Sequence, residues 1–188
     1  LKENDVNNRI CLKMALLCEH KCLTFVPTIK IATTMSEWFN KKFKGSFESA
    51  VVSAKTPKKE RLDIIKRFKD MNDNLNHIIN FGTLTTGFDF PELSHIIGGR
   101  PTMSLALYCQ MIGRGCRRNR DNTTLHYYDM SGNYEFFGDV QKLTIEKLND
   151  VWRCFIGDKL FTGFPLNCGL TITKQTIFSV VSRRDKLV

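Results

Sequence analysis

Residues 85–91 read Thr-Thr-Gly-Phe-Asp-Phe-Pro and residues 110–117 read Gln-Met-Ile-Gly-Arg-Gly-Cys-Arg, and these two stretches decide the fold. The first predicts a sharp turn at Gly87, and the second places Arg114 and Arg117 three residues apart. On a helix, residues at that spacing project to the same side. The planar guanidinium of arginine binds two phosphate oxygens at once and stays charged at any accessible pH. The pair therefore indicates a site for a polyphosphate.

Around these stretches, apolar runs of β type alternate with helical patterns as far as about residue 135. This alternation is typical of a parallel sheet that is covered by helices on both faces. The sequence therefore predicts one doubly wound α/β domain. Its expected strands are residues 22–26, 50–53, 77–81, 95–97 and 124–129.

Helical spacing of apolar residues predicts helices over residues 31–43, 57–68 and 105–112, and another helix, residues 5–19, is expected before the first strand. Thr56 is expected to cap the second of these helices, because Pro57 follows it and proline is favoured at the first helical position. Thr102 or Ser104 is expected to cap the helix that ends near the paired arginines.

The pattern changes after about residue 136, so we expect a domain of residues 1–138 and a small C-terminal extension of residues 139–188. The start of the extension, through Leu143 and Leu148, has a helical pattern. Gly157 and Asp158 lie between two short apolar runs, which predicts a β-hairpin. A further turn is expected over residues 165–169.

Composition narrows the class of protein. The 188 residues are 42% hydrophobic, enough for one sizeable core. The formal charge of +9 favours a polyanionic partner, although a solvated cationic face is the alternative.

No apolar run is long enough for a membrane span. The seven cysteines come without a secretory signature, so we expect reduced thiols in the cytosol. Cys18, His20 and Cys22 match no common zinc spacing, and we expect no metal site there. The first residue is not Met, so we expect a fragment or a processed piece.

Three motifs resemble the second RecA-like domain of superfamily 2 helicases and translocases, over roughly residues 1–138. Residues 23–28, Leu-Thr-Phe-Val-Pro-Thr, are similar to the strand and loop that open this domain, and residues 85–91 are similar to its glycine-aspartate motif. Residues 110–117 fit its Gln-x-x-Gly-Arg-x-x-Arg motif at every defined position. Arg100-Pro101-Thr102 and residues 129–133 look most like RadD-type bacterial helicases and their phage-encoded relatives. One departure is Ser53-Ala54, where many relatives have His-Gly.

The resemblance implies a domain that closes on an N-terminal RecA-like partner domain, with ATP and Mg²⁺ held between them mainly by that partner. Arg114 and Arg117 would then be catalytic arginine fingers, Gly87 and Asp89 would line the nucleotide cleft near the ribose, and Gln110 would organise the cleft. Taken alone, the arginines would equally suit the C-terminus of a helix in solvent, where cations are favoured. Gly87 and Asp89 would likewise suit a plain turn.

Nucleic-acid contacts are expected from Thr28, Thr85 and Thr86, because hydroxyls and amides at the edge of a parallel sheet can hold a sugar-phosphate backbone. Ser53 and Lys55 are further candidates. For each threonine, local turn capping is an equal alternative. The basic run of residues 55–69 could follow phosphates, but such a run is usually a solvated helix face. The expected partner is single-stranded or branched DNA, with RNA as the alternative.

The chain contains no Gly-x-x-x-x-Gly-Lys-Ser/Thr loop, so none of its segments is expected to cradle the β- and γ-phosphates. We therefore expect the C-terminal half of an ATP-dependent DNA helicase or translocase of the RadD or phage repair-helicase group. It would be inactive as an ATPase alone and would work in the cytosol of a bacterium or of a phage-infected host. The alternatives are a nucleic-acid-binding module with a degenerate motor, an RNA helicase and a branch-migration translocase.

Overall fold

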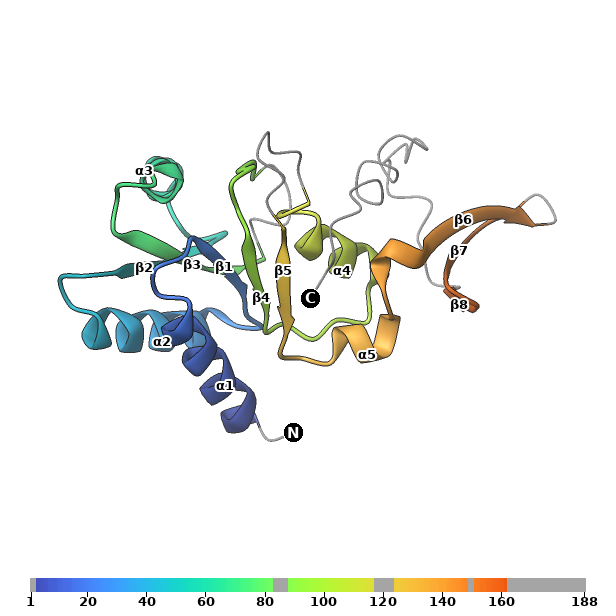
Figure 1. Cartoon of the computed structure of the whole chain (residues 1–188), viewed down its shortest axis with the longest axis horizontal. Coiled ribbons are helices and arrows are strands. Elements are labelled where there is room, and N and C mark those ends of the chain that lie inside the picture. The colour runs from blue at the N-terminus through green and yellow to red at the C-terminus, as the bar shows by residue number, and fades with distance from the viewer. Residues whose placement is uncertain (1–2, 83–87, 117–123, 149–150, 162–188) are drawn as a thin grey trace.

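A five-stranded sheet is the centre of the structure, a computed structural model that describes residues 3–82, 88–116, 124–148 and 151–161. Its strands are β1 (Cys22–Phe25), β2 (Glu48–Ser53), β3 (Leu75–Phe81), β4 (His95–Gly98) and β5 (His126–Asp129). Their order across the sheet is β2-β3-β1-β4-β5, and every neighbouring pair is parallel (Figure 1). All five predicted strands are confirmed, with shifts of one or two residues at their ends.

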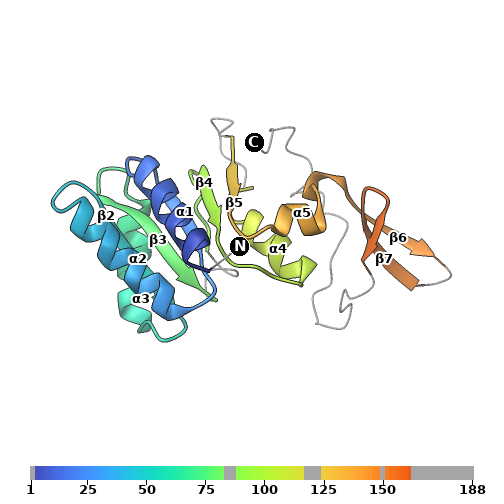
Figure 2. The ribbon, with the colours of Figure 1, turned by 90° about the horizontal axis from the view of Figure 1, so that it is seen from below.

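Helices cover both faces of this sheet. They are α1 (Glu3–Leu16), α2 (Ile29–Lys42), α3 (Lys58–Lys69) and α4 (Leu105–Ile112). In Figure 1, α3 and α2 lie on opposite sides of β2 and β3, and Figure 2 shows α1 and α2 together in front of the strands. The predicted doubly wound α/β fold is therefore confirmed.

Burial on both faces explains why the strands read as continuous apolar runs. Leu23 and Phe25 of β1 belong to the cluster that includes α3 and α4, whereas Cys22 and Val26 belong to the cluster that includes α1 and α2. Successive strand residues point to opposite faces, so a strand that is buried on both faces carries apolar residues at most of its positions.

Two helix starts differ in how well the sequence predicted them. Ser104 is the N-cap of α4, because its Oγ accepts a hydrogen bond from the Leu107 backbone N–H at 3.3 Å. The expected cap at Thr56 is wrong, since α3 begins at Lys58 with Pro57 in the N-cap position. The Thr56 hydroxyl instead accepts a hydrogen bond from the Ser53 N–H at 3.0 Å.

The C-terminal part is a short helix and a small antiparallel sheet. Its elements are α5 (Asn133–Phe137), the 3-10 helix η1 (Val140–Lys142), β6 (Leu143–Leu148), β7 (Val151–Ile156) and β8 (Lys159–Phe161). The hairpin predicted at Gly157 and Asp158 is confirmed, because β7 and β8 pair antiparallel around them. The helix expected through Leu143 and Leu148 is wrong, because these residues form β6, which pairs with β7.

Side chains of this antiparallel sheet join the main core. Cys154 and Ile156 of β7 are buried in the same cluster as Tyr108 of α4, and the Phe137 ring of α5 stacks on Tyr108 at a centroid distance of 5.0 Å. The boundary at residue 138 stays a prediction, and the turn expected at residues 165–169 lies outside the described residues. Among the described helices, none is long and apolar enough to cross a membrane.

Two buried histidines lie at the edge of the sheet where the strands begin, here called the amino edge. His77 is fully buried, and its Nε2 lies 3.0 Å from the Leu17 carbonyl oxygen at the end of α1. His95 stacks between His20 and His126, at centroid distances of 4.5 and 5.1 Å. Burial, with the neighbouring histidines, lowers the pKa of His77 and of His95 to about 4, and Lys13 adds to the effect on His95.

These pKa values predict that the protein loses stability in mild acid. Unfolded histidine has a pKa near 6.5, so the unfolded state binds more protons than the folded state between about pH 6.5 and 4. The free energy of unfolding should therefore fall through that window, by on the order of 1 to 3 kcal/mol for each histidine. Urea unfolding at pH 7, 6, 5 and 4 measures the fall. His77→Gln keeps a donor for the Leu17 carbonyl but cannot titrate, so its profile should be shallower than that of the parent; parallel profiles would contradict the prediction.

Candidate functional site

The predicted site residues separate to two edges of the sheet. Three lie towards the amino edge, and three lie at the edge where the strands end, here called the carboxyl edge. Asp89, Gln110 and Arg114 lie towards the amino edge. Thr28, Ser53 and Lys55 lie at the carboxyl edge. The remaining four, Thr85, Thr86, Gly87 and Arg117, lie outside the described residues, and their roles stay predictions.

Arg114 joins the two motifs that the sequence singled out. It follows the C-terminal end of α4, and its Nη1 donates a hydrogen bond to the Phe88 carbonyl oxygen at 3.0 Å. Its Nε donates to the Gln110 carbonyl oxygen at 3.3 Å, which holds the side chain back along its own helix. The guanidinium is thus fixed beside the backbone that leads into Asp89.

The segment around Asp89 is held by its neighbours in sequence. Phe88 and Phe90 are buried, and their rings contact Phe68 of α3 at centroid distances of 6.1 and 5.5 Å. Asp89 between them is exposed. This alternation directs the carboxylate away from the core. Two buried aromatic rings therefore present one carboxylate, which suits a contact with a polar ligand.

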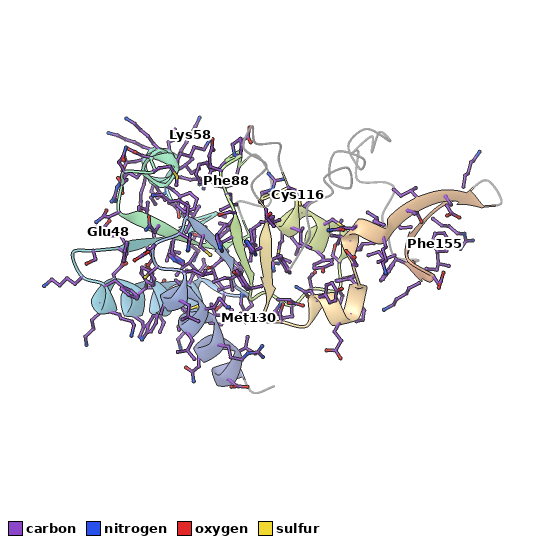
Figure 3. All side chains as sticks on the ribbon, viewed as in Figure 1. Glu48, Lys58, Phe88, Cys116, Met130 and Phe155 are labelled. Carbon is purple, nitrogen blue, oxygen red and sulfur yellow. The ribbon has the colours of Figure 1, made fainter. Side chains whose placement is uncertain are left out.

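Packing at the end of α4 fixes its position near the amino edge. A side-chain carbon at Gly115 would clash with Leu125, and Leu125 immediately precedes β5. Figure 3 shows Cys116 near the start of β5, on the same side as Phe88, whereas Met130 lies beyond the opposite end of that strand. Arg114 thus contacts the backbone of Gln110 and of the residue before Asp89, and the roles of these three residues at a nucleotide stay predictions.

At the carboxyl edge, Thr28 has a capping role, which the sequence analysis gave as the alternative to a nucleic-acid contact. It is the N-cap of α2, and its Oγ1 accepts a hydrogen bond from the Ile31 N–H at 3.2 Å. The residue is exposed, and its hydroxyl proton is not used in that bond. The capping contact and a contact with a phosphate are therefore compatible.

Ser53 is the last residue of β2, and Lys55 lies in the tight loop that follows. Ser53 is buried, and its Oγ accepts a hydrogen bond from the Lys55 N–H at 3.2 Å. Lys55 is exposed. The Ser53 side chain therefore shapes the loop, and the Lys55 side chain is the one available for a ligand.

Arg61 is a residue whose contribution the sequence reasoning missed. It was grouped with the solvated basic run, but its Nη2 donates hydrogen bonds to the carbonyl oxygens of Ser53 at 3.2 Å and Thr56 at 2.9 Å. Side chains on a helix lean towards its N-terminus, so an arginine in the first turn of α3 reaches back over the preceding loop. The signal was its place one turn after Pro57.

Removing Arg61 should loosen this loop. Arg61→Ala leaves the Ser53 and Thr56 carbonyls without their charged donor, and we expect a loss of about 1 to 3 kcal/mol in the free energy of unfolding. The Thr56 amide, which bonds to the Ser53 carbonyl at 3.1 Å, should exchange its hydrogen at least several-fold faster. Hydrogen exchange of residues 53–56 measures this. Lys58→Ala, an exposed cation on the same helix, is the control, and equal exchange in both variants would refute the role of Arg61.

Potential metal ligands do not cluster in the described residues. Within residues 3–82, 88–116, 124–148 and 151–161, no three His, Cys, Asp or Glu side chains form a group that could hold a metal ion. Burial raises the pKa of the Cys22 and Cys109 thiols to about 12, which keeps both protonated near neutral pH. Both thiols are therefore weak nucleophiles in this structure.

Comparison with known proteins matches most of the chain to a helicase domain. Residues 7–119 match the model of the helicase conserved C-terminal domain. Over 81 residues the chain is 38% identical to a Saccharomyces cerevisiae protein that carries the name of an ATP-dependent helicase, IRC3. The matched region is 43% of this chain and 12% of that protein. Over 91 residues it is 35% identical to a 51.5 kDa protein of a Lactococcus phage, 48% of this chain and 20% of the other. The matched regions thus span a fifth or less of these relatives.

Solved structures agree on the fold. A fragment of the HsdR subunit of a type I restriction enzyme from Vibrio vulnificus matches 73% of this chain and 28% of its own with a TM-score of 0.61. The C-terminal domain of the DEAD-box protein Dbp5 matches 72% of this chain and 74% of its own with a TM-score of 0.57. Both are 20% identical in sequence, so they show a shared fold alone.

Proposed function

Because this chain belongs to the family of helicase conserved C-terminal domains, we propose that it is the C-terminal motor half of an ATP-dependent superfamily 2 DNA helicase or translocase. In this proposal it closes against an N-terminal RecA-like domain, which carries the phosphate-binding loop and holds most of the contacts with ATP and Mg²⁺. The proposal extends to the RadD or phage repair-helicase group and to action in the cytosol; a Lactococcus phage protein is among the relatives of this chain.

The observation that carries the proposal is the bond from Arg114 to the Phe88 carbonyl. It places a guanidinium beside the carbonyl of the residue before Asp89, and in the proposal this region offers both a cation for the γ-phosphate and a carboxylate for the ribose. Arg117, Gly87 and Gln110 complete this surface in the proposal. A positioned arginine stabilises the charge that spreads over the transferred phosphoryl group, and such a residue changes the rate by about 10³- to 10⁵-fold.

Nucleic acid is proposed to lie along the carboxyl edge. Thr28 and Lys55 are exposed there, and Thr85 and Thr86 follow β3 in sequence. The formal charge of +9 favours a polyanion, because cations that neutralise phosphates release counterions. Closure on ATP and opening after hydrolysis would change the grip on the strand and advance the motor.

Replacement of Arg114 tests the motor assignment. In the full-length polypeptide, Arg114→Ala should reduce nucleic-acid-stimulated ATP hydrolysis by about 10³-fold or more, while nucleotide binding is largely kept. Hydrolysis is measured with no polymer, with single-stranded and duplex DNA, and with RNA, so the stimulating polymer is identified in the same assay.

The control for this assay is Arg9→Ala, which removes an exposed arginine from α1. Arg114→Lys keeps the charge but loses the planar donor pair, and a thermal melt of each variant shows whether it folds. Turnover of folded Arg114→Ala at the parent rate would remove the finger assignment. An inactive parent under every condition would instead favour a nucleic-acid-binding module.

A further inference from the structure

Helix N-termini gather at the carboxyl edge, because α2, α3 and α4 each follow a strand that ends there. An N-terminus carries a partial positive charge of roughly half a unit, which acidic residues in the first turn offset. The first turns of α2 and α4 contain no acidic residue. The carboxyl edge therefore attracts anions near β1 and β4.

Arg100 adds a full charge to this edge. It follows β4, and its guanidinium carbon lies 5.9 Å from the centre of the Phe81 ring, the last residue of β3. Because β1 lies between β3 and β4, the Arg100 side chain reaches across the end of β1. Phe81 is also the register partner of Ser53 in β2. The predicted nucleic-acid contacts at the carboxyl edge begin in the loop after β2, and Arg100 extends them to the end of β4.

The backbone of Arg100 is held in place from two sides. Asn133, which is 2% exposed, donates from Nδ2 to the Arg100 carbonyl at 2.9 Å and accepts at Oδ1 from the Thr102 N–H at 3.0 Å. On the other side, the Gly99 N–H donates to the Phe25 carbonyl at 2.9 Å. A side-chain carbon at Gly99 would also lie 2.9 Å from that oxygen, so glycine permits the close approach. The backbone that carries the Arg100 side chain is therefore fixed before any ligand binds.

The guanidinium of Arg100 has donors to spare. In the part of the chain that the structure describes, it forms neither a hydrogen bond nor an ion pair. An arginine has five N–H donors in a planar fork that suits phosphate. The guanidinium lies over the Phe81 ring, a cation–π contact that does not use its N–H donors.

We infer that Arg100, supported by Phe81, binds a backbone phosphate of a single nucleic-acid strand that lies along the carboxyl edge beside Thr28 and Lys55. The inference rests on the proposed function and names a residue that the motifs did not single out for this role. Phosphate contacts carry no base information, so this contact is independent of sequence.

Binding of a labelled oligonucleotide by the 188-residue chain tests the inference. Fluorescence anisotropy with a single strand of mixed sequence, in DNA and in RNA form, is measured between 50 and 200 mM salt. Arg100→Ala should bind about tenfold more weakly at low salt. The slope of the logarithm of affinity against the logarithm of salt concentration should become shallower by about 0.7, the value for one phosphate on a single strand. Arg100→Lys should keep most of the slope but bind more weakly than the parent, because it lacks the planar fork.

The matched control is Lys41→Ala, which removes one exposed charge from the last turn of α2, at the amino edge, and should leave affinity and slope unchanged. Equal binding by Arg100→Ala and the parent would overturn the inference. Weaker binding with an unchanged slope would also overturn it, because that result indicates altered structure and not a lost phosphate contact. A parent that binds neither strand would end both this inference and the nucleic-acid part of the proposed function, whereas the motor part is tested separately through Arg114.

Discussion

Parallel pairing in the main sheet is the constraint on which the rest of the structure depends. Because all five strands run in one direction, each chain segment leaves the sheet at the carboxyl edge and must return to the amino edge before the next strand. Helices α2, α3 and α4 make that return, so they begin at the carboxyl edge and end at the amino edge. Their positive ends therefore gather where nucleic acid is proposed to bind, and Arg114 is delivered to the opposite edge.

The connection from β3 to β4 is the segment that links these two regions. It begins at Phe81, which supports Arg100 at the carboxyl edge, and it passes Asp89, which follows the carbonyl bound by Arg114. The register pairs of β1 and β3 cover four residues, so the two edges of the sheet are on the order of 10 to 15 Å apart at these strands, at about 3.3 Å per residue. One segment thus has contacts in both regions, an arrangement suited to a protein that couples nucleotide state to its grip on a strand.

Sequence patterns predicted elements correctly where a local rule was sufficient. The double-sided burial of β1, β3 and β4 produced apolar runs, and Ser104 caps α4 through a bond within its own first turn. The same rules failed where partners come from elsewhere. The strand β6 was mistaken for a helix, because its alternation of Leu143 and Ile145 has meaning only against Ile156 and Cys154 of β7.

The sequence by itself determined the fold class, the positions of the five strands along the chain and the two motifs that contain the arginines and Gly87. Residue periodicity and short spacings are local properties, so they can be recognised without the tertiary structure. Only the tertiary structure decided which residues share an edge. It joined Arg114 to Phe88, turned Arg61 back onto the loop of Ser53, and brought Arg100 onto Phe81 across a whole strand. Those pairs depend on crossover connections and sheet order, which long-range packing sets and no short stretch of sequence contains.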